Sequence, residues 1–178
     1  MARWLLALAA VLSTSSALAA SRGGVTLPDT VEVGGQQLIL NGIGVSKKAM
    51  FQLFVVGLYL PAQTTDRAAV LEVDGPRRLV LHLSRDLPAE QIQADVAAKL
   101  PTVPDHMHAA VVAWTTLLGE SPADAELVAE FRPGAGVALS VSGQPKGTLT
   151  GADDMKAILA MYVGDAAVKD VRNGLLGQ

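Results

Sequence analysis

The chain has 178 residues, half of them hydrophobic, with 14 basic and 17 acidic side chains and a formal net charge of −3. This length suits one domain with a sizeable core, and the acidic balance argues against a nucleic-acid binder, which would present a basic face. The absence of cysteine excludes disulfides and thiolate chemistry.

The N-terminus has the pattern of a secretory signal peptide. Arg3 supplies a positive charge, residues 4–12 form a short apolar run, and Ala17-Leu18-Ala19 gives the small-x-small pattern that signal peptidase reads. We expect cleavage after Ala19 or Ala20. The apolar run is too short to span a bilayer, which takes about 20 residues.

We therefore predict a signal peptide over residues 1–20 and one domain over residues 21–178. No later segment of the chain reads as a membrane span. A signal peptide on a chain without cysteine is most simply explained by a periplasmic location.

The first half of the domain reads as strands. Residues 21–24 are expected to form a disordered leader, because they contain two glycines and no apolar pattern. Val31–Val33 and Gln36–Leu40 predict a β-hairpin whose turn is Gly34-Gly35. Residues 50–60 predict a long strand, and their near-continuous apolar character indicates burial on both faces over part of its length.

The middle of the chain alternates and then becomes helical. Residues 78–84 place Leu79, Leu81 and Leu83 on one face of a strand. Residues 88–99 predict a helix with a proline in its first turn. Residues 105–118 predict a second helix that ends at Gly119, and residues 121–124 look like a capping turn.

The last third predicts three strands and two helices. The strands are residues 126–131, 136–141 and 146–149, and the helices run through Tyr162, with a cap at residues 150–153, and from about Val168 to Leu176. Strands segregated from paired helices predict an α+β domain with a largely antiparallel sheet covered by helices on one face.

Four segments of the chain stand out together. They are Leu40-Asn41-Gly42-Ile43-Gly44-Val45 leading to Gly57-Leu58-Tyr59-Leu60, Leu81 to Asp86, Phe131 to Val137, and Ala157 to Asp165 with Asn173 to Gly177. In order and spacing, over residues 26–177, they resemble the chalcone-isomerase-like family, particularly its secreted bacterial branch. The resemblance implies the chalcone isomerase fold, an open-faced β-sandwich in which a large antiparallel sheet is covered by a layer of helices, with a ligand cleft between them.

The positions of the family's catalytic side chains hold other residues in this chain. Chalcone isomerases use an Arg, a Thr and a Tyr, and the resemblance places these on Ser46, Phe54 and about Ile92. Lys47 or Lys48 could supply a cation, but lysine lacks the planar fork of guanidinium. We therefore expect no catalytic residues. Related fatty-acid-binding proteins of the same fold hold a carboxylate with an Arg in the cleft.

Arg85 is the strongest candidate for a ligand-binding residue. It follows an apolar strand and precedes a helix, where its side chain could bind an anionic head group bidentately. The alternative is a structural ion pair with Asp86 or Asp95. Phe54, Tyr59 and Lys48 are the further ligand-binding candidates, although core packing also explains Tyr59.

Other chemistry-bearing residues do not predict a site. His106 and His108 beside Asp105 suggest a metal site, but residues two apart on a helix do not share a face. His82, Trp114 and Tyr162 read as a solvated residue and two core residues. No phosphate loop or nucleophile elbow is found. We expect no metal and no cofactor.

The leading hypothesis is a periplasmic, non-catalytic protein that binds a small apolar or amphipathic ligand such as a fatty acid. One alternative is an intramolecular lyase, an isomerase acting on a chalcone-like or other conjugated substrate with Lys47, Lys48 or Arg85 stabilising an enolate. Another is a cell-envelope interaction module, for which the sequence offers no exposed heptad or basic amphipathic helix.

Overall fold

The computed structural model describes residues 19–72 and 74–178. Within them, seven strands form one antiparallel sheet in which each strand pairs with its neighbours in sequence. A separate two-stranded ribbon precedes it, made of β1 (Ala19–Arg22) and β2 (Val25–Pro28). The strands of the sheet are β3 (Thr30–Val33), β4 (Gln36–Lys48), β5 (Phe51–Leu60), β6 (Arg77–Leu83), β7 (Glu126–Arg132), β8 (Gly136–Val141) and β9 (Gln144–Leu149).

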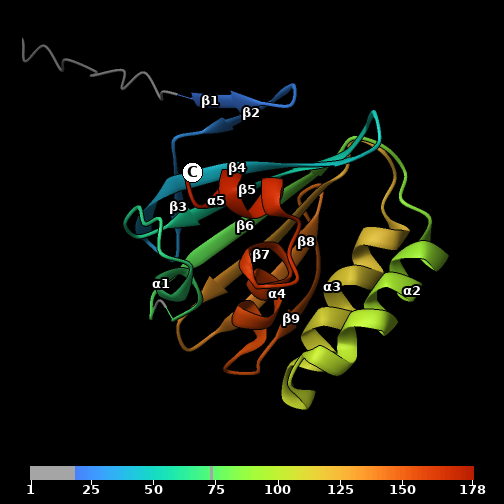
Figure 1. Ribbon diagram of the computed structural model, residues 1–178. Helices are drawn as coiled ribbons and strands as arrows, with labels where there is room; N and C mark the ends of the chain where they lie inside the picture. Colours follow the sequence, from blue (N-terminus) through green and yellow to red (C-terminus); the bar gives the residue numbers. More distant parts are fainter. Residues whose placement is uncertain (1–18, 73) are drawn as a thin grey trace, which may run out of the picture.

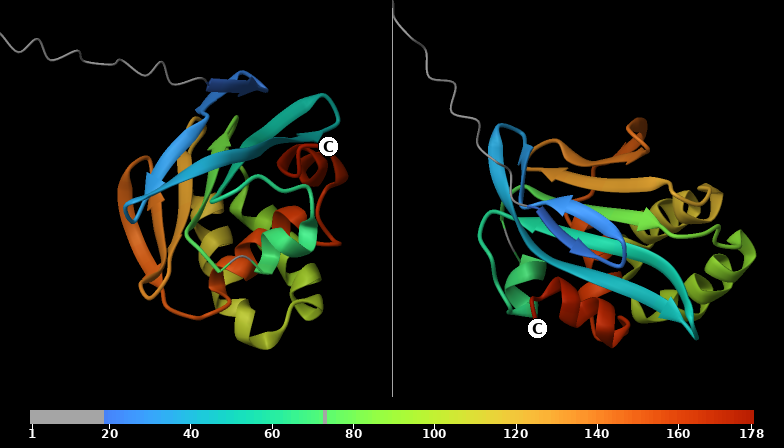
Figure 2. Two further views of the ribbon diagram at one scale, coloured as in Figure 1. Left: turned by 90° about the vertical axis from the view of Figure 1, so that its left-hand side faces the viewer. Right: turned by 90° about the horizontal axis from the view of Figure 1, so that it is seen from above.

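The helices gather on one face of this sheet, as Figures 1 and 2 show. They are α1 (Arg67–Glu72), α2 (Ala89–Lys99), α3 (His108–Glu120), α4 (Asp154–Val163) and α5 (Lys169–Leu175). Fully buried Trp114 and Ile158 pack from the helices against leucines of β5 and β6. The predicted α+β architecture, a large antiparallel sheet covered by helices, is confirmed.

Two-residue periodicity explains how the central strands serve two cores. In β6, Leu79, Leu81 and Leu83 belong to the cluster beneath the helices, and Val80 belongs to a second cluster on the opposite face. Successive side chains of a strand point to opposite faces. The same division holds in β5, so the predicted burial on both faces of this strand is confirmed.

The ribbon β1–β2 replaces the disordered leader that the sequence predicted at residues 21–24. Gly23 and Gly24 form its turn with φ angles of 59° and 79°. The ribbon is held against the sheet because Leu27 is buried over Gly57, where an added Cβ would come within 2.3 Å of the leucine side chain. Leu27 and Gly57 are far apart in the sequence, so local composition does not reveal this contact.

The second strand of the predicted hairpin runs on to Lys48 rather than ending at Leu40. The Asn-Gly sequence lies inside β4, where the pairing with β5 is irregular between Leu40 and Gly42. Asn41 donates from Nδ2 to the Leu175 carbonyl at 2.6 Å. A Cβ on Gly42 would lie 2.2 Å from the Gly174 carbonyl oxygen. This close approach seats α5 on β4.

Helix ends differ slightly from the prediction. Gly119 does not end α3, which continues to Glu120. The absence of a side chain at Gly119 instead lets α2 approach, since a Cβ there would lie 3.0 Å from the Ala89 Cα. Residues 121–124 connect α3 to β7, and the predicted capping turn is found at the end of α3, where Ser121 is the C-cap and its hydroxyl donates to the Leu117 carbonyl at 2.6 Å. At α4, Asp153 is the N-cap but makes no side-chain capping bond. The remaining predicted elements are found within a few residues of their expected bounds.

The predicted signal peptide falls almost entirely outside the described residues, which begin at Ala19. Its last two residues, Ala19 and Ala20, form the start of β1. Among residues 19–72 and 74–178, none of the helices has the length and apolar character needed to cross a bilayer.

Candidate functional site

A pocket of about 830 Å³ lies between the helix-covered face of the sheet and the helices. Its walls come from the ends of β4 and β5, the connection from β6 to α2, helices α2 to α5 and the connection between α4 and α5. Figure 1 shows the β4–β5 turn and the β6–α2 connection beside each other at one end of the sheet. The volume is within the roughly 300–1,000 Å³ typical of small-molecule sites.

Most of the pocket wall is apolar. Side chains from all four helices take part, among them Ile92, Val96, Val111, Met161 and Val171. Several of these side chains have almost no contact with bulk solvent, since Val111 is only 4% and Val171 only 2% exposed. Such a wall favours the burial of a hydrocarbon chain, at about 0.8 kcal/mol per methylene group.

Tyr162 is the main polar group in the interior of the pocket. Its hydroxyl accepts a 2.7 Å hydrogen bond from Nε1 of the fully buried Trp114. Burial raises the pKa of Tyr162 far above its usual value, with only partial opposition from the hydrogen bond, so the phenol stays neutral. In the described part of the chain its own proton has no acceptor. It can therefore donate to a group inside the pocket.

Thr115 lines the pocket as well but has little capacity to bind a ligand. Its hydroxyl donates to the Val111 carbonyl at 2.7 Å, four residues earlier in the same helix. A threonine bonded in this way has satisfied its donor locally. The interior therefore offers one neutral phenol and otherwise mostly apolar surface.

Two cations, Arg85 and Lys48, lie at the mouth of the pocket. Arg85 is exposed, and its guanidinium carbon lies 5.3 Å from the ring centroid of Phe51. Neither Asp86 nor Asp95 comes within ion-pair distance of it in the described chain. Asp86 instead accepts a hydrogen bond from the Ala123 N–H at 2.6 Å. The structural ion pair that the sequence offered as an alternative for Arg85 is not present.

The structure brings three of the four predicted ligand-binding residues together. Arg85, Phe54 and Lys48 line the pocket, and Tyr59 does not. Tyr59 belongs to the cluster on the opposite face of the sheet, and its hydroxyl donates to the Pro28 carbonyl at 2.9 Å. Burial raises the pKa of Tyr59 to about 12.

The positions at which the family resemblance placed catalytic side chains all lie in this pocket. Ser46, Phe54 and Ile92 each line its wall, and register pairing sets Ser46 opposite Phe54 on β4 and β5. None of these three side chains can carry a charge or act as a phenol. The pocket therefore lies where the family resemblance implies a cleft, but these positions of its wall lack the side chains that the family uses for catalysis.

His106 and His108 each contact another group of the protein. Nε2 of His106 lies 3.2 Å from an Asp153 carboxylate oxygen, and Nε2 of His108 lies 2.7 Å from the Val103 carbonyl oxygen. Among the residues that the structure describes, no three His, Cys, Asp or Glu side chains are grouped as a metal site would require.

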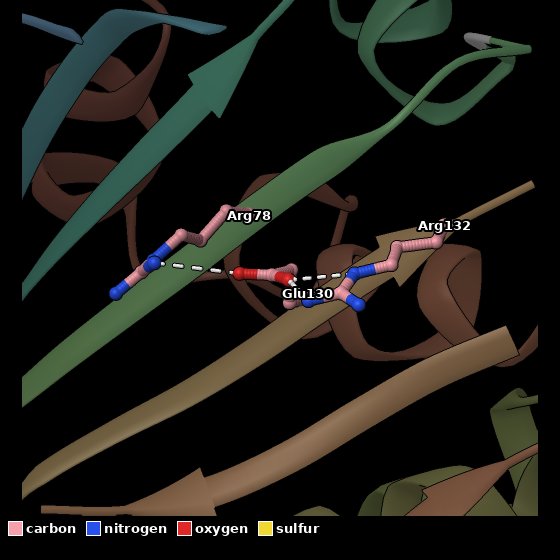
Figure 3. A network of polar contacts seen from close by, with 3 residues as sticks. All are labelled: Arg78, Glu130 and Arg132. Carbon is pink, nitrogen blue, oxygen red and sulfur yellow. Dashed lines mark hydrogen bonds and ion pairs between the residues drawn. The ribbon is translucent and has the colours of Figure 1, made fainter. Parts of the chain in front are cut away.

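A smaller hollow of about 290 Å³ includes residues of β6 to β9, and Figure 3 shows three of its charged side chains. Glu130 lies between Arg78, at 3.3 Å, and Arg132, whose Nε donates at 2.9 Å. The two guanidiniums already share a carboxylate, and the apolar wall of the larger pocket is missing. The larger pocket is thus the better candidate site.

Comparison with known proteins gives a matching family and solved structures of similar fold. The family model described as chalcone isomerase-like matches residues 19–177. None of the curated proteins compared with the chain matches it. Among solved structures, a fatty-acid-binding protein of Arabidopsis thaliana aligns with a TM-score of 0.67 at 15% identity, over 89% of this chain and 96% of that one. At this identity the likeness shows a shared fold.

Proposed function

We propose that this chain, which belongs to the chalcone isomerase-like family, is a non-catalytic member that binds a small amphipathic ligand. A fatty acid is the ligand class that fits best. Its hydrocarbon tail would occupy the 830 Å³ pocket, and its carboxylate would lie at the mouth beside Arg85 and Lys48.

The observation that carries this proposal is a mostly apolar pocket whose cations, Lys48 and Arg85, lie at its mouth and whose carboxylates, from Asp86, Asp95 and Asp165, are exposed. Stabilising an enolate requires preorganised charge next to the reacting atoms, and Ser46, Phe54 and Ile92 provide none. The solved structure of similar fold is a fatty-acid-binding protein, which supports the same ligand class. The neutral Tyr162 leaves the interior without a buried charge that would oppose a hydrocarbon chain.

Typical free energies of interaction indicate that the hydrocarbon tail supplies most of the binding affinity. Each buried methylene contributes about 0.8 kcal/mol, whereas an exposed ion pair contributes about 0–1 kcal/mol. Because Arg85 is exposed, we expect its main effect to be on the orientation of the ligand. Lys48, at the same mouth, should also orient the ligand.

Native mass spectrometry and thermal shift with a long-chain fatty acid test the proposal. Ala160→Phe adds a large side chain to the pocket wall on α4 and should abolish binding. Ala109→Phe makes the same change at an exposed position of α3 outside the pocket and should leave binding intact. Arg85→Gln should weaken binding of the acid by about fivefold and leave binding of the matching fatty alcohol unchanged.

The proposal fails if no lipid binds, or if Ala160→Phe binds the acid as well as the original chain does. Ring closure of a chalcone faster than in buffer, and lost in Arg85→Ala, would instead favour the isomerase alternative. We also propose that the protein is secreted to the periplasm, on the strength of the pattern in residues 1–20. The mass of the purified mature protein should then place its first residue at Ala20 or Ser21.

A further inference from the structure

The most exposed apolar side chains of the described chain gather around the mouth of the pocket. Met50 is 87% exposed and Phe51 is 57% exposed, and both lie where β4 turns into β5. Val168, at 53%, lines the same pocket as Phe51. Large apolar side chains grouped at one place on a surface usually mark an interaction site.

Cations flank this apolar tip, although the chain as a whole has a net charge of −3. Lys47 and Lys48 are exposed at the end of β4, and Arg85 stacks on Phe51. In residues 19–72 and 74–178, none of the three forms an ion pair with a carboxylate. The nearest carboxylate in sequence, Asp86, is hydrogen-bonded to the Ala123 N–H.

The combination of apolar and cationic side chains fits the surface of a bilayer. Apolar side chains enter the boundary between head groups and acyl chains while cations stay at the phosphates, and each lysine or arginine near an anionic leaflet adds to the attraction. Figure 1 shows the β4–β5 turn projecting at one end of the sheet. A narrow projecting turn offers less area than a stable protein interface, which buries roughly 800 Å² per partner.

We propose that the tip formed by residues 47–51, together with Arg85, docks on an anionic phospholipid membrane. Met50 and Phe51 insert among the head groups, and Lys47, Lys48 and Arg85 face lipid phosphates. This geometry sets the mouth of the pocket against the bilayer. If the proposed function holds, a fatty acid can pass between membrane and pocket without crossing bulk water.

Vesicle co-sedimentation tests the docking without touching the pocket, because neither Lys47 nor Met50 lines it. Vesicles of phosphatidylcholine with phosphatidylglycerol should bind the full mature protein, and pure phosphatidylcholine vesicles should bind it much more weakly. Lys47→Gln should weaken binding about fivefold, and Met50→Ser about tenfold. Val112→Ser and Lys146→Gln alter exposed residues elsewhere and should bind as the original chain does.

The docking proposal is overturned if anionic vesicles do not bind, or if the tip and control variants bind them equally. A dimer in solution that Met50→Ser dissolves would show that the tip binds a second copy, and would also overturn it. Fatty-acid binding measured in the same Lys47→Gln and Met50→Ser variants without vesicles should be unchanged. If vesicles do not bind, the proposed function is unaffected. If fatty acids do not bind, the vesicle experiment still tests the docking.

Discussion

The hydrogen bond between Trp114 and Tyr162 should be worth a measurable part of the stability of the fold. Trp114 is fully buried, and its Nε1 donates to the tyrosine hydroxyl at 2.7 Å. Tyr162→Phe removes the acceptor and leaves a buried N–H without a partner. Leaving a buried donor unsatisfied costs about 1–3 kcal/mol. For a domain of this size, each kcal/mol lowers Tm by roughly 2–4 °C.

Tyr59→Phe is the matched control for this substitution. The Tyr59 hydroxyl donates to the carbonyl of Pro28 at 2.9 Å, and Pro28 is exposed, so water can replace the lost donor. We expect a cost below about 1 kcal/mol. Both variants are compared by denaturant unfolding, at unchanged m-value. If Tyr162→Phe costs no more than Tyr59→Phe, the buried hydrogen bond is not stabilising the helix layer as described.

Three further predictions concern the two buried tyrosines, the contact between α5 and β4, and the length of the bound fatty acid. Tyr59 and Tyr162 are the only tyrosines of the chain, and burial raises the pKa of both, so the folded protein should show no tyrosinate absorbance below about pH 11. Stability conferred by the neutral phenols should be complete below about pH 10 and fall as the pH rises toward 12; a folded-state titration near pH 10 would contradict their burial. Gly44→Ala would set a Cβ 2.6 Å from the Val171 carbonyl oxygen and should cost about 1–3 kcal/mol, and an unchanged denaturation midpoint would show that α5 is not seated on β4 as described. Fatty-acid affinity measured by Trp114 fluorescence should rise about fourfold per added methylene until the pocket is filled, and a series with no dependence on chain length would rule out burial of the tail.

Local patterns in the sequence predicted the strands that build the sheet. Leu79, Leu81 and Leu83 alternate with less apolar residues in β6, because the three leucines face the core beneath the helices, whereas Arg78 and His82 on the opposite face are only half-buried. The ribbon β1–β2 was missed because it depends on Leu27 packing over Gly57, a contact between distant parts of the chain.

The candidate site was predictable at its mouth and not in its interior. Arg85, Lys48 and Phe54 lie at the ends of neighbouring antiparallel strands, which bring them to the same end of the sheet. Tyr162 was interpreted as a core residue, and it is buried as expected. Its place in the pocket wall follows from how α4 packs against α3, which no local pattern specifies.

A structure of the protein with a fatty acid that carries bromine at the end of its tail would show directly whether the tail lies in the pocket. We predict an anomalous bromine signal beside the buried wall residues Val111, Thr115 and Tyr162, with the carboxylate within hydrogen-bonding distance of Arg85 or Lys48. Bromine at the mouth with the carboxylate inside, or no ligand in the pocket, would contradict it.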